Sequence, residues 1–428
     1  MIKRIVLSKN NFIEAGGQQM CKCLICGNKV EKIIDFGKMP IANGFLSEDM
    51  FDKEKFYPLE VGVCPVCNMV QLTKQVDRED MFNDNYAYFS STSNRMQKHF
   101  KEFAYWVMDT FLSENPFVVE IGSNDGIMLQ NYANKKIKHL GVEPSENVAQ
   151  VAREKGINTI SCFFDKENAE KIKEEYGLAD VVVGTNVLCH IPYIHSVFDG
   201  VTSLLKPKGV LIFEDPYVGD IVQRISYDQI YDEHAFYFSV SSISYLAEMH
   251  GLEVIDAIHQ NVHGGSMRYI LARKGARKVS NEVKELFRYE EEQGLKEYST
   301  YLKFADDVEQ NKRDLLALLK KLKAEGKRIV GYGATSKSTT VLNYCGIGTD
   351  YIEFISDTTP IKQGKYTPGM HIPVKSYEDF KKEYPEYTVL FAWNHGEEII
   401  EKESAYKEAG GKFILYVDHV RIDGENNG

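Results

Sequence analysis

The most informative segment of the chain is a glycine-containing loop at the end of a short apolar run. It reads Val119-Glu120-Ile121-Gly122-Ser123-Asn124-Asp125-Gly126. Small residues in such a loop let a ligand approach the backbone closely at the carboxyl edge of a parallel sheet. The segment therefore predicts the first strand and the first ligand loop of a doubly wound α/β domain.

The sequence around this loop alternates short apolar runs with helical segments. The predicted strands are 118–121, 139–142, 181–183 and 210–213, and the predicted helices are 147–154, 166–175 and 242–250. An earlier helix is predicted by Met96, Phe100, Phe103, Val107 and Phe111, which recur at helical spacing. This alternation is typical of an open, mostly parallel sheet with helices on both faces.

A second α/β alternation occupies the C-terminal part. A charge-rich helical stretch carries an apolar stripe of Phe304, Val308, Leu315, Leu319 and Leu322, as expected of an amphipathic helix packed on a core. Strands are then predicted over 329–332, 352–355, 389–391 and 413–417. We expect three units: a small N-terminal domain over 1–80, a Rossmann-like domain over 81–278, and helices leading into a smaller α/β domain over 279–428.

Two Cys-x-x-Cys pairs define the N-terminal unit. Cys23 with Cys26 and Cys64 with Cys67 have the spacing of two knuckles that close a four-sulfur zinc site. A redox pair is the alternative, but that motif follows a strand in a βαβ unit, whereas these pairs lie in short strand-and-turn sequence. Cys21 is an alternative ligand. The predicted zinc ion is structural, and we assign it no chemistry.

Length and charge limit the classes of partner. The 428 residues carry 51 Lys and Arg against 62 Asp and Glu, a formal charge of −11, which argues against nucleic acid or an anionic membrane as the partner. No apolar run approaches the ~20 residues that span a bilayer. We therefore expect a cytoplasmic protein.

The loop at 119–126 favours S-adenosylmethionine over a dinucleotide. Glu143 ends the next predicted strand, where a carboxylate can accept both ribose hydroxyls, although an acid there also fits NAD. Glu120 precedes the loop in the manner of class I methyltransferases, and the third glycine of the dinucleotide fingerprint is missing. Asn124 replaces the usual middle glycine and tolerates a positive φ; a structural turn is the remaining alternative. The predicted cofactor residues are Glu120, Gly122, Ser123, Asn124, Asp125, Gly126, Glu143 and Asn186.

Candidate catalytic groups follow the later strands of this sheet. His234 lies between carboxylates and tyrosines in a segment beyond 210–213, and a histidine there is a plausible general base. Tyr231 could donate to an oxygen that gains negative charge. His190 follows the strand at 181–183. Each histidine alone could be a packing residue, but their expected place on one sheet edge favours function.

The C-terminal domain contains Gly331-Tyr332-Gly333-Ala334-Thr335-Ser336-Lys337 between a strand and a helix. Backbone N–H groups with Lys337 one turn into the helix suit a diphosphate. Tight packing of strand on helix also explains the glycines. Asp357 and the later Trp393-Asn394-His395 could hold a nucleobase or ribose beside that site.

Taken in order, the motifs resemble those of the bacterial nucleotide-sugar C-methyltransferases. They are the two Cys-x-x-Cys pairs, Tyr86-x-Tyr88-x-Ser90-Ser91, the loop at 120–126, Tyr231-x-Glu233-His234, His263-Gly264-Gly265-Ser266-x-Arg268 and Gly331-x-Gly333-Ala334-x-x-Lys337. The resemblance covers nearly the whole chain. It implies a zinc-binding N-terminal domain, a methyl-donor domain and a C-terminal domain that helps to hold the nucleotide-sugar.

The resemblance also implies roles for individual residues. His234 is the expected base, while Tyr231, Glu233, His190 and either Tyr86 or Tyr88 line the sugar site. The expected reaction removes a proton beside a keto group, at C-3 of a 4-keto-6-deoxy sugar, and transfers a methyl group to that carbon. The expected contacts to the nucleotide-sugar are Gly333, Ala334, Lys337, Asp357, Asn394, His263 and Arg268.

Three alternatives stay open at this point. An O- or N-methyltransferase on a nucleotide-sugar needs no proton removal from carbon, a two-domain dehydrogenase would bind nicotinamide, and a non-catalytic zinc protein would bind nucleic acid. The sequence does not fix the nucleotide, the choice of hexose or heptose, the stereochemistry, or whether the protein is a monomer or a homodimer.

Overall fold

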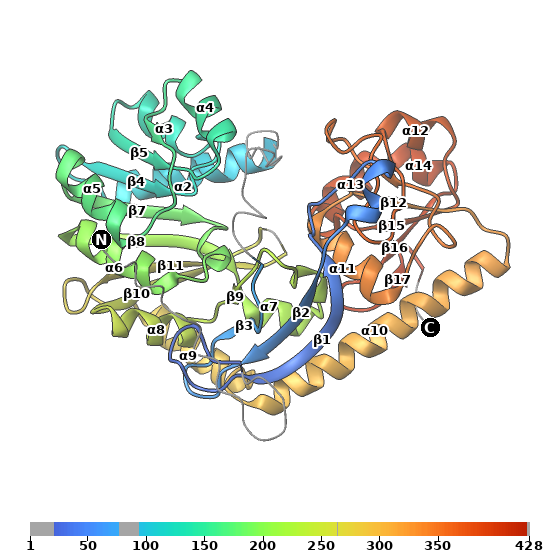
Figure 1. The fold of residues 1–428 in the computed structure, drawn as a ribbon, viewed down its shortest axis with the longest axis horizontal. Helices are drawn as coiled ribbons and strands as arrows, with labels where there is room; N and C mark the ends of the chain where they lie inside the picture. The colour runs from blue at the N-terminus through green and yellow to red at the C-terminus, as the bar shows by residue number, and fades with distance from the viewer. Residues whose placement is uncertain (1–20, 77–93, 263, 426–428) are drawn as a thin grey trace, which may run out of the picture.

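The computed structural model describes residues 21–76, 94–262 and 264–425. These residues form three sheets of four, seven and six strands. Figure 1 shows the seven-stranded and six-stranded units side by side, with the long strand β1 and the long helix α10 running between them along the base. In the described part of the chain, no helix has both the length and the hydropathy of a membrane-spanning segment.

The N-terminal sheet has the order β1-β2-β3-β9. Its strands are β1 (Glu31–Pro40), β2 (Phe56–Val63), β3 (Val70–Leu72) and β9 (Phe236–Tyr237), and the 3₁₀ helix η1 (Glu48–Lys53) lies in the β1–β2 connection. Cys64 follows β2 directly, so one cysteine pair stands at the end of the hairpin. β9 comes from the segment just after His234 and pairs antiparallel with β3. The first and second predicted units therefore share a sheet, which the predicted boundary near residue 80 does not reflect.

The seven-stranded sheet confirms the predicted Rossmann-like domain. Its order is β10-β11-β8-β7-β4-β5-β6, with the β8–β11 and β11–β10 pairs antiparallel and the others parallel. The strands are β4 (Phe117–Ile121), β5 (Lys138–Val142), β6 (Thr159–Ile160), β7 (Ala179–Thr185), β8 (Leu205–Pro216), β10 (Leu252–Gln260) and β11 (Ser266–Arg273). β4 is central, and the ligand loop follows it as predicted.

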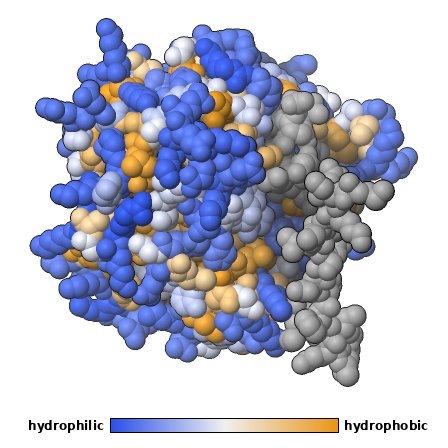
Figure 2. Space-filling model, turned by 60° about the vertical axis from the view of Figure 1, so that its left-hand side comes forward, coloured by the Kyte–Doolittle hydropathy of each residue, from blue (hydrophilic) through white to orange (hydrophobic). Residues whose placement is uncertain are grey.

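Helices cover both faces of this sheet because its central strands are buried on both sides. Val119 of β4 contributes to a core that includes side chains of α5, α6 and α8, whereas its neighbour Val118 contributes to a core with α2 and α3. The helices of this unit are α2 (Asn94–Phe111), α3 (Leu129–Asn134), α4 (Glu146–Glu154), α5 (Lys166–Tyr176), α6 (Ile194–Leu204), α7 (Val218–Arg224) and α8 (Val240–Met249), with the 3₁₀ helices η3 (Leu188–His190) and η4 (Tyr227–Gln229). On the face shown in Figure 2, apolar side chains form small scattered groups among hydrophilic ones.

The C-terminal unit begins with α9 (Asn281–Glu292) and the 27-residue α10 (Tyr298–Ala324). The apolar stripe predicted for the second helix is buried, as expected of an amphipathic helix. The sheet order is β14-β13-β12-β15-β16-β17, parallel except for β17. Its elements are β12 (Ile329–Tyr332), α11 (Ser336–Cys345), β13 (Ile355–Ser356), β14 (Val374–Lys375), α12 (Tyr377–Lys382), β15 (Tyr387–Leu390), η5 (Trp393–His395), α13 (Gly396–Lys402), α14 (Ser404–Glu408), β16 (Lys412–Leu415) and β17 (Arg421–Ile422).

One predicted strand of this unit is shorter than expected. The apolar run at 352–355 predicts a strand of that length, but β13 covers only Ile355–Ser356. Ile352 and Phe354 are buried all the same. Burial of an apolar run therefore does not require that its backbone join the ladder.

Candidate functional site

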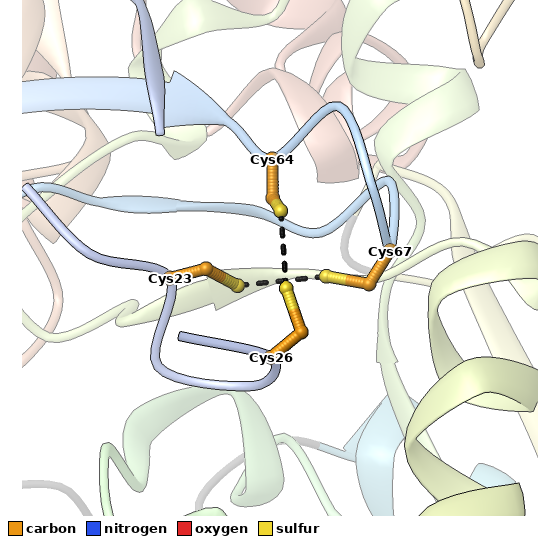
Figure 3. Close-up of side chains that lie close together, drawn as sticks. All are labelled: Cys23, Cys26, Cys64 and Cys67. Atoms are coloured by element: carbon orange, nitrogen blue, oxygen red, sulfur yellow. Dashed lines mark hydrogen bonds between the residues drawn. The ribbon is translucent and has the colours of Figure 1, made fainter. Parts of the chain in front are cut away.

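Four cysteine thiols converge at the start of the N-terminal sheet (Figure 3). The Sγ atoms of Cys23 and Cys67 lie 3.5 Å apart and those of Cys26 and Cys64 lie 3.3 Å apart, with all four within 4.8 Å of one another. All four are free thiols, a donor set that suits tetrahedral zinc. Cys21 lies outside the cluster and its thiol donates to the carbonyl of Thr73 at 3.4 Å, so it is not a ligand.

The two knuckles are built in the same way. Gly27 and Asn68, each just after the second cysteine of a pair, have φ of 73° and 57°. Their backbone N–H groups donate to the carbonyls of Cys23 and Cys64, both at 2.9 Å. The left-handed residue reverses the chain so that both thiols of a pair point to one side. None of the four cysteines lines the cavity described next, which agrees with a structural zinc site.

A cavity of about 340 Å³ lies at the carboxyl edge of the seven-stranded sheet. Its wall includes residues of all three units: Asn43 from the N-terminal unit, the loops after β4, β5 and β7, and Lys337 from α11. Met96 and Phe100 of α2 add apolar surface. Side chains from three units therefore surround one space.

At one end of the cavity, Gly122, Asn124, Glu143 and Asn186 line the wall as predicted. The carboxylate of Glu143 accepts from the backbone N–H groups of Asn124 at 3.0 Å and Ser145 at 2.9 Å. Asn124 has a φ of 48°, so an asparagine does take the left-handed position of the usual middle glycine. Gly122 also has a positive φ, and a Cβ there would lie 2.6 Å from Val187.

The other four predicted cofactor residues, Glu120, Ser123, Asp125 and Gly126, do not line the cavity. Asp125 forms an ion pair with Lys155 at 3.1 Å, and a Cβ on Gly126 would lie 2.3 Å from Ile157. Ser123 is fully buried. Burial and the nearby carboxylates of Glu143 and Asp125 hold the pKa of Glu120 well above its ordinary value. These residues shape the loop.

His234 also lines the cavity, together with Tyr231, Glu233 and His190. The Nδ1 atom of His234 is 2.9 Å from the carbonyl oxygen of Gln229. Because a carbonyl can only accept, Nδ1 carries the proton and Nε2 carries the lone pair. The ring centroids of Tyr231 and His190 are 4.1 Å and 4.9 Å from that of His234.

Burial shifts the charge states of the groups around His234. Desolvation lowers the pKa of His190 to about 4, so this imidazole is neutral near pH 7. Desolvation and the adjacent Asp232 raise the pKa of Glu233 to about 7, against the stabilising effects of Asn43 and Lys362. A neutral imidazole, that of His190, and a carboxyl group whose pKa is about 7 therefore lie beside His234.

Lys337 lines the cavity from the first turn of α11. Burial lowers its pKa, and the buried Asp228 partly offsets that effect. Thr335 caps the helix by accepting from the N–H of Ser338 at 3.2 Å. Lys362, whose Nζ donates to the carbonyl of Ala334 at 2.7 Å, adds a second cation to the wall.

Known proteins match all three parts of this chain. The chain is 36% identical over 405 residues to the C-methyltransferase NovU of Streptomyces niveus, in a match that covers 94% of this chain and 96% of that protein. The chain belongs to the C-methyltransferase family. Its family-model matches are "Putative zinc binding domain" over residues 23–82, "Methyltransferase domain" over 88–257 and "C-methyltransferase C-terminal domain" over 261–418.

More distant relatives match a smaller part of this C-methyltransferase. A ubiquinone biosynthesis O-methyltransferase of Colwellia psychrerythraea is 29% identical over 159 residues, which is 34% of this chain and 64% of that protein. A solved S-adenosylmethionine-dependent methyltransferase from Anabaena variabilis has 14% identity and a TM-score of 0.36, covering 44% of this chain and 89% of that one. The cofactor is S-adenosylmethionine, as predicted, and the cysteine centre matches the zinc-binding domain.

Several residues of this C-methyltransferase that were predicted to contact the acceptor do not line the cavity. Gly333 does not line the cavity; it has a φ of 90°, and a Cβ there would lie 2.6 Å from Ala392, so close packing explains it. Asp357 accepts from the N–H of Ala334 at 2.7 Å and holds the loop in shape. Asn394 does line the cavity.

Arg268 is also placed differently from the expectation. Its Nε donates to Glu214 at 2.6 Å, Glu214 also contacts His99 at 2.7 Å, and the guanidinium lies 3.7 Å from the ring centre of Phe103. Arg268 does not line the cavity and instead fastens α2 to the sheet. Tyr86, Tyr88 and His263 lie outside the described residues.

Asn43 and Lys362 are cavity residues that the sequence did not indicate. Asn43 follows a strand in a turn that carries no ligand motif, and Lys362 is an isolated lysine in a loop. Each reaches the site through a long-range contact between units, which local periodicity does not encode.

Proposed function

We propose that this C-methyltransferase acts on a nucleotide-linked 4-keto-6-deoxy sugar and methylates C-3, the carbon beside the keto group. The observation that carries the proposal is the fixed tautomer of His234, in a cavity that residues of the cofactor loop also line. A base with its lone pair on Nε2 can take a proton from carbon, which a transfer to oxygen or nitrogen does not require.

The chain's residues would divide the work as follows. His234 Nε2 takes the proton from C-3, and the electron pair moves toward the keto oxygen to give an enolate. Tyr231, Glu233 and His190 line the sugar's place and orient it. Bound S-adenosylmethionine would supply the methyl group that C-3 receives, with S-adenosylhomocysteine as the leaving product.

The C-terminal unit would hold the nucleotide part of the acceptor. Lys337 and Lys362 place two cations in the cavity wall, and Asn394 adds an amide. A nucleotide-sugar diphosphate is anionic, whereas the whole chain carries a formal charge of −11. Local cations at the cavity would therefore attract an acceptor that the rest of the surface repels.

The test uses the full chain loaded with zinc and a panel of 4-keto nucleotide-sugars. Mass spectrometry should find the mass of one added methylene, and exchange of the C-3 proton with deuterated water should occur without methyl donor. His234→Asn should keep cofactor binding and lose most of both reactions, since general-base catalysis contributes about 10²–10⁴-fold. Methyl transfer without exchange would favour the O- or N-methyltransferase alternative, and near-normal turnover in the variant would remove His234 as the base.

A further inference from the structure

Residues 41–46 of the N-terminal unit, which follow β1, reach the catalytic end of the cavity. The backbone N–H of Ala42 donates to Asp232 Oδ1 at 2.9 Å, and Asn43 Nδ2 donates to Glu233 Oε1 at 2.7 Å. Two consecutive residues thus hold two consecutive carboxyl groups that lie 190 positions later in the chain. Glu233 is the residue directly before His234.

The C-terminal unit holds residues 41–46 from the other side. Thr339 Oγ1 donates to the carbonyl of Ala42 at 2.8 Å, and Leu46 and Tyr366 exchange two backbone hydrogen bonds of 3.2 and 2.9 Å. Lys362 Nζ lies 4.7 Å from the ring centre of Phe45. The segment is therefore held at both ends, so the amide of Asn43 is presented to Glu233 from a fixed backbone.

The carboxyl group of Glu233 needs such a partner because it is buried. Burial favours its neutral form, and the charged group that faces it on its own segment is Asp232, which repels a second negative charge. Asn43 and Lys362 act in the opposite direction from the two other units. A hydrogen bond from an amide also fixes which oxygen faces the cavity, since an N–H donor selects one lone-pair direction.

We propose that Asn43 is a positioning residue that acts through Glu233, so that the zinc-binding unit completes the acceptor end of the active site. The proposal rests on the proposed function in placing Glu233 beside the acceptor. The knuckles and Asn43 lie at opposite ends of β1, whose 10 residues span about 33 Å. The zinc ion would thus support catalysis by holding a strand, with no contact to substrate.

A double-mutant cycle on the zinc-loaded full chain tests whether Asn43 acts through Glu233. Asn43→Ala should lower kcat/KM for a 4-keto nucleotide-sugar about tenfold, because a hydrogen bond to a charged group is lost. In a Glu233→Gln background the same change should cost less than about twofold. Asn281→Ala, an exposed residue of α9, is the matched control and should have no effect. Equal losses in both backgrounds, or no loss from Asn43→Ala, would overturn the proposal.

A second measurement does not depend on turnover. Carboxyl ¹³C NMR can follow the titration of Glu233, with the Glu233→Gln spectrum identifying its resonance. Asn43→Asp keeps the shape but replaces the donor with a negative charge, so the titration midpoint should rise by about one pH unit or more; an unchanged midpoint contradicts the proposal. If the wild-type protein methylates no sugar of the panel, the proposed function fails, while the midpoint still decides whether Asn43 controls Glu233.

Discussion

Asp228 Oδ2 accepts the indole N–H of Trp393 at 2.5 Å, across the boundary between the methyltransferase and C-terminal domains. The same oxygen accepts from the hydroxyl of Tyr416 at 2.6 Å, and the carboxyl group of Asp228 partly offsets the lowering of the Lys337 pKa by desolvation. One fully buried carboxylate thus joins two domains and supports a residue of the cavity wall.

Asp228→Ala should lower the free energy of unfolding by about 2–5 kcal/mol, because two buried donors lose their acceptor. Urea unfolding measures this change. Glu285→Ala is a suitable control, since its pair with Arg288 at 2.8 Å is exposed on both sides and should contribute about 0–1 kcal/mol. Similar losses in the two variants would show that the buried carboxylate has no special role.

The titration of Glu233 should make stability fall as pH rises. Burial and Asp232 raise the pKa of this residue to about 7, so the folded protein keeps a proton that the unfolded chain loses near pH 4.5. The unfolding free energy should therefore fall by up to about 3 kcal/mol between pH 4.5 and 7 on this account. Glu233→Gln should lack that part of the pH dependence, whereas the exposed Glu408→Gln should keep it. If the unfolding free energies of wild type and Glu233→Gln changed with pH in the same way, Glu233 would not have the raised pKa that its burial predicts.

The amount of zinc that each variant retains should show which of the five N-terminal cysteines bind the metal. Cys64→Ser should release the metal and lower the melting temperature, because a closed four-sulfur centre loses one of its ligands. Cys21→Ser should keep a full equivalent of zinc after dialysis, since its thiol faces the Thr73 carbonyl. Atomic emission on both variants measures the outcome, and metal loss from Cys21→Ser would reopen the ligand assignment.

Arg268→Lys should weaken cofactor binding although no atom of Arg268 lines the cavity. A lysine cannot reproduce both the hydrogen bond to Glu214 and the stacking on Phe103, so α2 would be less firmly held. Met96 and Phe100 of that helix line the cavity. We expect affinity for S-adenosylhomocysteine to fall about three- to tenfold by calorimetry. Arg288→Lys, an exposed arginine of α9 that pairs with Glu285, is the comparison, and equal affinities would place Arg268 outside any binding role.

The sequence was sufficient to predict those features that depend on residues close together in the chain. Strands such as β4 are buried on both faces and so read as continuous apolar runs, and the cysteine spacing gave the four thiols that meet. Asn124 was correctly expected to tolerate a left-handed conformation. In each case neighbouring residues carry the whole signal.

Acidic residues at strand ends were harder to interpret. Glu143 lines the cavity, whereas Asp357, in a similar position, accepts a backbone N–H and shapes a loop. A carboxylate at a strand end can accept hydrogen bonds from a ligand or from the backbone, and the sequence does not show which. Asn43 joins Glu233 across 190 residues, a relationship that no local pattern contains.

The pairing of β9 with β3 has a consequence for how this enzyme can be varied. β9 begins two residues after His234, so the loop that carries the proposed base is fastened to the zinc-binding sheet. Exchanging the central domain alone between relatives would join a foreign catalytic loop to the resident sheet. If the proposed function holds, the residues that choose the acceptor are not contiguous in the sequence, so productive chimaeras should exchange residues 41–72 together with residues 227–237.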